Sequence, residues 1–238
     1  MYNYNFLQDV LMPKYPDKTI LIIVLGCFVC AAIGYLIGSI NFSIIISNIF
    51  YKDDIRTHGS GNAGSTNMLR THGTVPGLLT FAGDLIKTAI AVIIGALIYN
   101  LIGAYVAGFF CIIGHVFPLY FKFKGGKGVA TVAMVMALTN IRTFIVCFII
   151  FLIIVIGTKY VSLGSIISVL VYPLLLFNIL KLYHAQGYEY IGVIFAALIA
   201  VIVVVKHKSN IKKIYNHTES KISFTKHGAD SSKSNRNK

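Results

Sequence analysis

Long apolar runs restrict what this chain can fold into more than any other feature. A helix needs about 20 apolar residues to cross the hydrocarbon core of a bilayer, and lipid offers no hydrogen-bond partners to an irregular backbone. Such runs recur along most of the chain, at residues 19–47, 77–99, 101–120, 127–140, 142–159, 162–182 and 188–206. The sequence therefore predicts an all-α integral membrane protein with seven transmembrane helices.

The composition indicates one membrane unit rather than a soluble domain with an anchor. Only 12% of the 238 residues are charged and the mean hydropathy is +0.77, whereas soluble domains carry about 25% charged residues. The run 19–47 is longer than the roughly 7–15 residues of a signal-peptide core, so we interpret it as a retained span. We expect residues 1–214 to form the seven-span domain and the basic polar tail 215–238 to be disordered.

The distribution of Lys and Arg predicts the orientation in the membrane. Most of these 21 residues fall in 48–76, in 121–127, at Lys159 and after residue 205. Because cytoplasmic loops carry the excess of positive charge, we expect the C-terminus in the cytoplasm and the N-terminus outside. This placement accounts for the net charge of +13, so the chain is expected to contact the lipid bilayer and no nucleic acid.

The residues that could hold a metal are few and badly spaced. The four cysteines all lie inside apolar runs, where they are best interpreted as buried structural thiols. Among the eight acidic residues only Asp53 and Asp54 form a close pair, which suits neither a two-carboxylate mechanism nor a divalent-cation cage. We expect neither a metal nor a cofactor.

The stretch RTHGSGNAGSTNMLR, from Arg56 to Arg70, differs sharply from its apolar surroundings. Glycine lets backbone amides approach a ligand closely, exposed N–H groups in such turns form anion-binding concavities, and Arg binds phosphate in a bidentate manner. Connecting loops are also rich in Gly, Ser and Asn. Composition alone leaves both interpretations open. The polar candidates within the stretch are Ser60, Asn62, Thr66 and Asn67.

A second polar segment combines three lysines with a glycine cluster. It reads Gly114-His115-Val-Phe-Pro118 and then Lys122-Phe-Lys124-Gly125-Gly126-Lys127-Gly128-Val-Ala-Thr131. The spacing is not that of a Walker A loop. Glycines that expose amides just before a helix begins nevertheless favour an anion at the helix N-terminus. We therefore interpret this segment as a phosphate-binding loop.

Three smaller polar clusters leave their roles open. Ser162-Leu-Gly164-Ser165 opens the sixth expected span and is typical of helix capping and close packing. His207, in Lys206-His207-Lys208-Ser209-Asn210, is by itself typical of a membrane interface. Asp84 and Lys87 share one face of the second span, where they either line a site or neutralise each other.

In their order along the chain, these motifs resemble a known family. They are Gly34-Tyr-Leu-Ile-Gly38-Ser39-Ile40, Asp54-Ile-Arg56, Gly59-Ser-Gly-Asn62, Thr66-Asn67, Leu69-Arg70, Asp84-Leu-Ile-Lys87, Gly114-His115-Val-Phe-Pro118, Lys124-Gly-Gly-Lys127-Gly-Val-Ala-Thr131, Ser162-Leu-Gly-Ser165-Ile and His207-Lys-Ser-Asn210-Ile. The chain resembles the bacterial membrane acyl-phosphate:glycerol-3-phosphate acyltransferases (the PlsY family) over about residues 20–215. It departs from the family's pattern at Asn41, at Thr88 and in a longer tail beyond Lys213.

The resemblance implies a seven-span enzyme of the bacterial inner membrane with its active site at the cytoplasmic face. Such an enzyme transfers a fatty acyl group from acyl phosphate to the sn-1 hydroxyl of glycerol 3-phosphate. It forms lysophosphatidic acid and phosphate in phospholipid biosynthesis, without a cofactor. The donor would come from a separate soluble phosphate acyltransferase.

The resemblance also implies roles for individual residues. The expected catalytic residues are Ser39, Arg56, His207 and Asn210. The expected substrate-binding residues are Ser60, Asn62, Thr66, Asn67, Arg70, Lys87, His115, Lys122, Lys124, Gly125, Gly126, Lys127, Gly128, Thr131, Ser162 and Ser165. The proton of the attacking hydroxyl would pass to a substrate phosphate oxygen or to His207.

A transporter or flippase for a phosphorylated metabolite is the alternative, because a basic, glycine-broken membrane site suits that function too. The expected topology brings the polar clusters to one face rather than to the bilayer midplane, and the sequence has no evident inverted repeat. Both features favour the enzyme.

Overall fold

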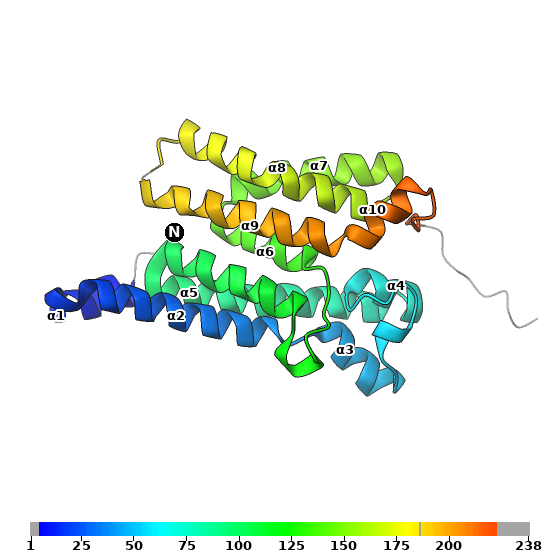
Figure 1. Cartoon of the computed structure of the whole chain (residues 1–238), viewed down its shortest axis with the longest axis horizontal. Helices are drawn as coiled ribbons and strands as arrows, with labels where there is room; N and C mark the ends of the chain where they lie inside the picture. Colours follow the sequence, from blue (N-terminus) through cyan, green and yellow to red (C-terminus); the bar gives the residue numbers. More distant parts are fainter. Residues whose placement is uncertain (1–4, 186, 223–238) are drawn as a thin grey trace, which may run out of the picture.

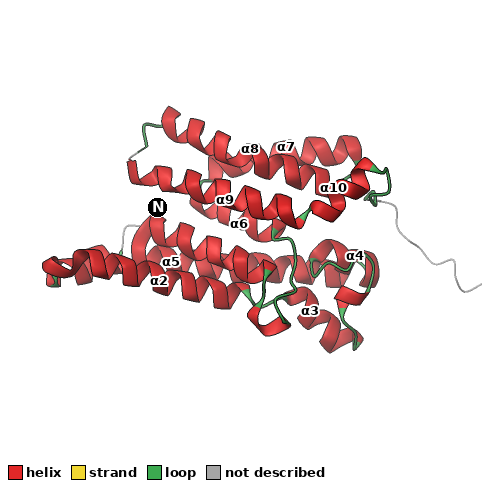
Figure 2. Ribbon diagram, in the orientation of Figure 1, coloured by secondary structure: helices red, strands yellow, loops and turns green. Residues whose placement is uncertain are grey.

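The computed structural model describes residues 5–185 and 187–222, and this part of the chain is helical with no strand (Figures 1 and 2). Residues 223–238, most of the tail expected to be disordered, lie outside the described residues. The α-helices are α1 Met12–Lys14, α2 Thr19–Gly38, α3 Phe42–Ile46, α4 Ser65–His72, α5 Thr74–Val116, α6 Val129–Thr139, α7 Ile141–Thr158, α8 Val161–Leu182, α9 Ile191–Lys206 and α10 Lys208–Tyr215. The expected all-α fold is confirmed for the described residues.

The expected span 19–47 is interrupted. Helix α2 ends at Gly38, and α3 begins only at Phe42. Asn41 lies between them with extended backbone, and its side-chain oxygen accepts a hydrogen bond from the Ile44 amide. Asn is among the strongest N-cap residues, so this residue starts a new helix where a continuous one was expected.

Helix α5 is a hairpin of two antiparallel arms. The helix breaks at Tyr99 and Asn100, and Asn100 has a φ of 48°, a region in which Asn is several-fold enriched among non-glycine residues. Residues on either side of the break then meet: Cys111 Sγ lies 3.8 Å from Thr88 Oγ1. The break falls at the expected boundary between spans 77–99 and 101–120.

Glycines bring α2 against the second arm of α5. A methyl group on Gly34 would collide with the carbonyl oxygen of Ala107, and one on Gly38 with that of Cys111. One on Gly114 would collide with the carbonyl oxygen of Tyr35. Association of helices in lipid depends on close van der Waals contact between small residues. These glycines therefore set the distance between α2 and α5.

The C-terminal half contains one helix that is too short to span. Helix α6 has 11 residues, about 16 Å at 1.5 Å per residue, against a hydrocarbon core of about 30 Å. The span expected at 127–140 thus contains a helix that is shorter than a full crossing. Of the described helices, four are long and apolar enough to cross a bilayer, or five when the α9–α10 pair, bent by 58°, is included. This count takes α5 once, although its arms run antiparallel.

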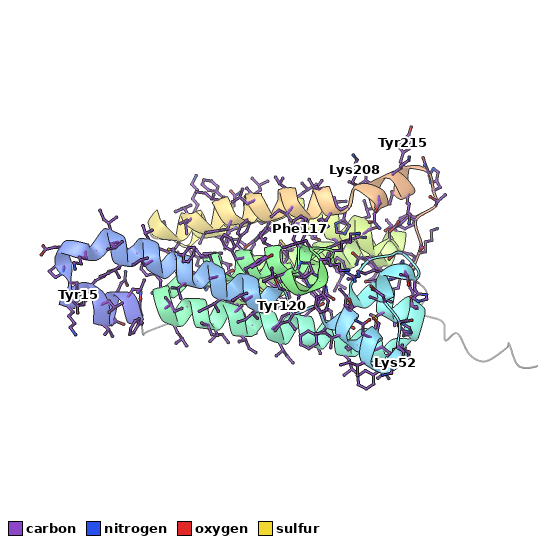
Figure 3. The ribbon with its side chains drawn as sticks, turned by 60° about the horizontal axis from the view of Figure 1, so that its bottom comes forward. Tyr15, Lys52, Phe117, Tyr120, Lys208 and Tyr215 are labelled. Carbon is purple, nitrogen blue, oxygen red and sulfur yellow. The ribbon has the colours of Figure 1, made fainter. Side chains whose placement is uncertain are left out.

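The polar loops gather at one end of the bundle. Lys52 and Lys208 lie at this end and Tyr15 at the opposite end (Figure 3). Between the ends, large apolar side chains are exposed along the helices, among them Phe28 and Ile153. An apolar surface of this extent on a helical bundle fits contact with lipid rather than with water.

Gly34→Leu should separate α2 from α5 and lower stability, because overpacking a tight contact typically costs about 1–3 kcal/mol. Thermal unfolding of the purified protein in detergent measures the effect. The matched control is Gly157→Leu in α7, where an added Cβ meets nothing within 4 Å. If both variants unfold at the same temperature as the unsubstituted protein, the α2–α5 contact does not limit stability.

Candidate functional site

Arg56 joins two loops at the polar end of the bundle. Its guanidinium forms a bidentate ion pair with Asp54, with an Nη2–Oδ2 distance of 2.7 Å. The same group donates to the carbonyl oxygens of Phe121 at 2.9 Å and Lys124 at 3.1 Å. The hydrogen bonds from Arg56 lower the pKa of the Asp54 carboxyl. Arg56 thus connects the loop before α4 to the loop before α6.

Asn67 shapes the glycine turn that follows Arg56. Its side-chain oxygen accepts from the Ser60 amide at 2.9 Å, and its side-chain nitrogen donates to the carbonyl oxygens of Ile55 and His58. A methyl group on Gly59, where φ is +55°, would collide with the Asn67 oxygen. Asn67 is 1% exposed, so its side chain supports the turn from the interior of the protein.

A buried ionic cluster lies between the arms of α5 and the end of α2. The Lys87 ammonium lies 2.8 Å from the Asp84 carboxylate and 3.0 Å from His115 Nδ1. It also donates to the carbonyl oxygens of Gly38 and Ile40, on either side of Ser39. Lys87, Asp84 and His115 are each less than 5% exposed. The cluster satisfies backbone groups that the break after α2 leaves without helical partners.

Ser39 itself is fully buried at this break. Its hydroxyl donates to the carbonyl oxygen of Tyr35 at 2.8 Å and accepts from the amide of Leu119 at 3.2 Å. The side chain therefore holds the loop that follows α5.

The glycine-lysine loop packs directly onto this cluster. The Gly126 amide donates to the His115 carbonyl at 3.1 Å, and the Gly125 amide donates to that of Val116. A methyl group on Gly126 would collide with the His115 ring. Gly128 has a φ of +77° at the start of α6, a conformation that glycine adopts at little cost. The glycines are needed here because the backbone passes so close to α5.

Lys127 extends from this loop into a chain of polar side chains. Its ammonium donates to the side-chain oxygen of Asn210 in α10. The Asn210 nitrogen donates to Glu219 Oε1 at 2.7 Å, and the Ser162 hydroxyl donates to the same oxygen at 2.7 Å. Residues from three distant parts of the sequence thus meet around one basic group.

A basic cavity of about 220 Å³ lies beside Lys127. It is lined by Ser60, Gly61, Asn62, Gly125, Lys127, Lys206, Ser209, Asn210 and Lys213. Burial lowers the pKa of Lys127 to about 8, and the positive charges of Lys213, Arg70 and Lys206 contribute in the same direction. The Glu219 carboxylate opposes this shift. Such a cavity favours an anionic ligand, which relieves the repulsion among the lysines.

His207 is buried between α9 and α10. It is 2% exposed, and its Nδ1 lies 2.7 Å from the Val203 carbonyl oxygen. Burial lowers its pKa to about 4, so the imidazole is neutral at pH 7. With Nδ1 donating to the carbonyl, Nε2 carries the free lone pair.

The structure divides the expected site residues into three groups. Those that line the cavity are Ser60, Asn62, Gly125, Lys127 and Asn210. Behind the lining, seven further residues are buried: Ser39, Asn67, Lys87, His115, Thr131, Ser162 and Ser165. Arg56, Thr66, Arg70, Lys122, Lys124, Gly126, Gly128 and His207 belong to the surrounding loops and helix ends. Whether each contacts a substrate stays a prediction.

Sequence reasoning missed five residues at this site: Gly61, Lys206, Ser209, Lys213 and Glu219. Lys213 could have been found, because a residue three positions after Asn210 on a helix shares its face. Glu219 is the only acidic residue between 206 and 222, which is a weak signal. Among residues 5–185 and 187–222 no group of three His, Cys, Asp or Glu side chains is arranged to hold a metal.

Comparison with known proteins identifies similar chains. The sequence model of the glycerol-3-phosphate acyltransferase family matches residues 28–217. The glycerol-3-phosphate acyltransferase of Finegoldia magna is 41% identical over 204 residues, covering 84% of this chain and 96% of the relative. That of Carboxydothermus hydrogenoformans is 40% identical over 200 residues, covering 83% and 97%.

Two solved structures have a similar fold. Both are crystal structures of PlsY (YgiH), an integral membrane glycerol 3-phosphate acyltransferase, and both are 30% identical to this chain. The glycerol 3-phosphate form has a TM-score of 0.75 and covers 83% of this chain and 96% of that protein. The lysophosphatidic acid form has a TM-score of 0.72 and covers 83% and 95%.

Lys87→Met should destabilise the protein, because removing one partner of a buried ion pair costs about 3–5 kcal/mol. The double variant Asp84→Asn/Lys87→Met removes the uncompensated carboxylate and should recover part of this loss. Unfolding in detergent, followed by circular dichroism, measures both. If Lys87 acted mainly on substrate, the single variant would unfold normally and only its KM would rise.

Proposed function

Because the chain belongs to the glycerol-3-phosphate acyltransferase family, we propose that it transfers a fatty acyl group from acyl phosphate to the sn-1 hydroxyl of glycerol 3-phosphate. The products are lysophosphatidic acid and inorganic phosphate. The observation that carries this proposal is the basic cavity, where the Ser60–Asn62 turn, the glycine-lysine loop and α10 meet.

The cavity suits two substrates that both carry phosphate. Backbone amides at glycine turns and lysine ammonium groups are the usual partners of phosphate oxygens. Lys127, Lys206 and Lys213 supply charge from two sides, and Ser60, Asn62 and Ser209 supply neutral donors. We assign the glycerol phosphate to the Lys127 ammonium, because the Gly125 and Gly126 amides already donate to the carbonyl oxygens of Val116 and His115.

For the chemical step, the enzyme has to position its two substrates more than it has to activate them. Acyl phosphate is already activated, since phosphate is a good leaving group. The glycerol oxygen attacks the acyl carbon, a C–O bond forms, and the bond from the acyl carbon to phosphate breaks. Fixing the two reactants together and stabilising the developing oxyanion supply the rate enhancement. Asn210, at the cavity wall beside Lys127, holds the Lys127 ammonium through its side-chain oxygen.

The hydroxyl proton is better accepted by a substrate phosphate than by His207. A general base works best when its pKa lies near the operating pH, and burial lowers the pKa of His207 to about 4. The second pKa of a phosphate monoester is about 6. We therefore place the proton on a substrate phosphate oxygen, with His207 orienting the junction of α9 and α10.

Ser39 and Arg56 would then act through the backbone. Ser39 holds the Leu119 amide, and Arg56 holds the carbonyl oxygens of Phe121 and Lys124. Together they support the loop that carries Lys122 and Lys124.

We further propose seven spans in residues 1–214, with the N-terminus outside and the active site at the cytoplasmic face of a bacterial inner membrane. Two features support this arrangement: α5 provides two antiparallel arms, and the cavity lies at the lysine-rich end of the bundle. There the acyl chain of the donor lies in the bilayer with its phosphate at the interface. A soluble phosphate acyltransferase would deliver that donor.

The alternative is a transporter for a phosphorylated metabolite. Turnover by the purified protein in detergent separates the two functions. With acyl phosphate and glycerol 3-phosphate we expect stoichiometric lysophosphatidic acid and phosphate. Acyl-coenzyme A and acyl-carrier protein should not replace the donor. Uptake of glycerol 3-phosphate into liposomes without phosphate release would instead indicate a transporter.

The KM for glycerol 3-phosphate should rise with pH above about 8. Lys127 has a pKa of about 8, so its ammonium is present below that pH and is lost above it, by about tenfold per pH unit. Lys127→Met should raise this KM at pH 7 and flatten its rise above pH 8. Lys208→Met, an exposed lysine outside the cavity lining, is the matched control. An unchanged KM in Lys127→Met would remove Lys127 from the phosphate site.

A further inference from the structure

The chain after α10 folds back over the site. A turn at His217, with a φ of 55°, reverses the backbone, and the amides of Thr218 and Glu219 donate to the Lys213 carbonyl. The Ser220 carbonyl oxygen then accepts from Arg70 at 3.2 Å, and the Ile222 amide donates to the Lys159 carbonyl at 2.9 Å. Contacts on two sides thus hold residues 218–222 against the bundle.

This segment places one carboxylate oxygen between two site residues. Glu219 Oε1 accepts from both the Ser162 hydroxyl and the Asn210 side-chain nitrogen, each at 2.7 Å. Ser162 and Asn210 are 7% and 8% exposed, so water competes little for these bonds. A carboxylate accepts only, so it fixes which end of the Asn210 amide faces it.

We propose, resting on the function above, that Glu219 is a positioning residue that acts through Asn210 on Lys127. With its nitrogen turned to Glu219, Asn210 presents its oxygen to the Lys127 ammonium. Without the carboxylate, either end of the amide could face Lys127, and an amide nitrogen there would repel the ammonium. The carboxylate therefore sets the orientation of a side chain that lines the cavity.

Because of the charges around Lys127, the contact with Glu219 should affect the pKa of Lys127. Among the charged groups of the described residues that most influence Lys127, all but one are positive, and the exception is the Glu219 carboxylate. The positive groups are Arg70, Lys206 and Lys213, and the neighbouring His207 is neutral at pH 7. Loss of the carboxylate should therefore lower the pKa of Lys127 below about 8.

In an alternative interpretation, the Glu219 carboxylate occupies the position of a substrate phosphate and competes with the substrate. The position of the carboxylate disfavours it. The cavity is lined by Lys127 and Asn210 but by neither Glu219 nor Ser162. Glu219 thus approaches Asn210 from outside the cavity and leaves the cavity free for a ligand.

The test compares Glu219→Gln, Glu219→Asp and the control Glu189→Gln, a carboxylate preceding α9 and remote in sequence from the site. Each is assayed between pH 6 and 9.5 with acyl phosphate and glycerol 3-phosphate, beside the unsubstituted protein. For Glu219→Gln we expect the alkaline rise in the glycerol 3-phosphate KM to move down by about one pH unit. At pH 8 the KM itself should rise about fivefold, and Glu219→Asp should recover part of the shift because it keeps the charge.

Each outcome decides the proposal. An unchanged pH profile of the KM in Glu219→Gln overturns the proposal. A lower KM with an unchanged kcat also overturns it, because that result would show that Glu219 competes with the substrate phosphate. If Glu219→Gln does not accumulate in the membrane, Glu219→Asp carries the test, since its shorter side chain cannot hold both Ser162 and Asn210 and should show a smaller shift in the same direction. Absence of turnover in the unsubstituted protein would instead refute the proposed function.

Discussion

The site depends on one lysine, Lys87, which donates hydrogen bonds to backbone carbonyl oxygens where a transmembrane helix breaks. Where α2 ends at Gly38, backbone carbonyls lose their helical partners in surroundings that hold little water. The Lys87 ammonium supplies the missing donor and is itself balanced by Asp84 and bonded to His115. His115 in turn accepts the Gly126 amide through its carbonyl. One buried cluster therefore fixes both the Ser39 break and the glycine-lysine loop, which are far apart in the sequence.

The cavity concentrates positive charge, and an anionic ligand relieves the repulsion among its lysines. Lys127, Lys206 and Lys213 border the same small volume, and burial together with mutual repulsion lowers the pKa of Lys127 to about 8. Slightly above neutral pH, Lys127 is thus near the limit at which it keeps its proton. An arriving phosphate favours the charged form. Binding of an anion and protonation of Lys127 are therefore coupled.

The sequence predicted elements that depend on composition over many residues. Apolar runs predicted the positions of the helices, and the break at Asn100 lies between two expected spans. Glycines and lysines at 125–128 located the loop next to the cavity. Single side chains that redirect the backbone or cross between segments were harder to predict. Asn41 divides a continuous apolar run, α6 ends after 11 residues, and Asn67 turns inward to hold backbone carbonyls. Glu219 meets Ser162 only through tertiary folding, which no local pattern encodes.

The hairpin of α5 also bears on the order in which the molecule assembles. Its arms contact each other through residues close in sequence, such as Gly95 and Gly103, and local contacts of this kind form early. α2 precedes it and packs on its second arm, so the Ser39 break, the Asn67 turn and the ionic cluster are all built from residues that come before α7. His207, Asn210 and Glu219 come from the last described part of the chain. The residues that shape the turns of the site therefore precede, along the chain, those proposed to act beside the substrate.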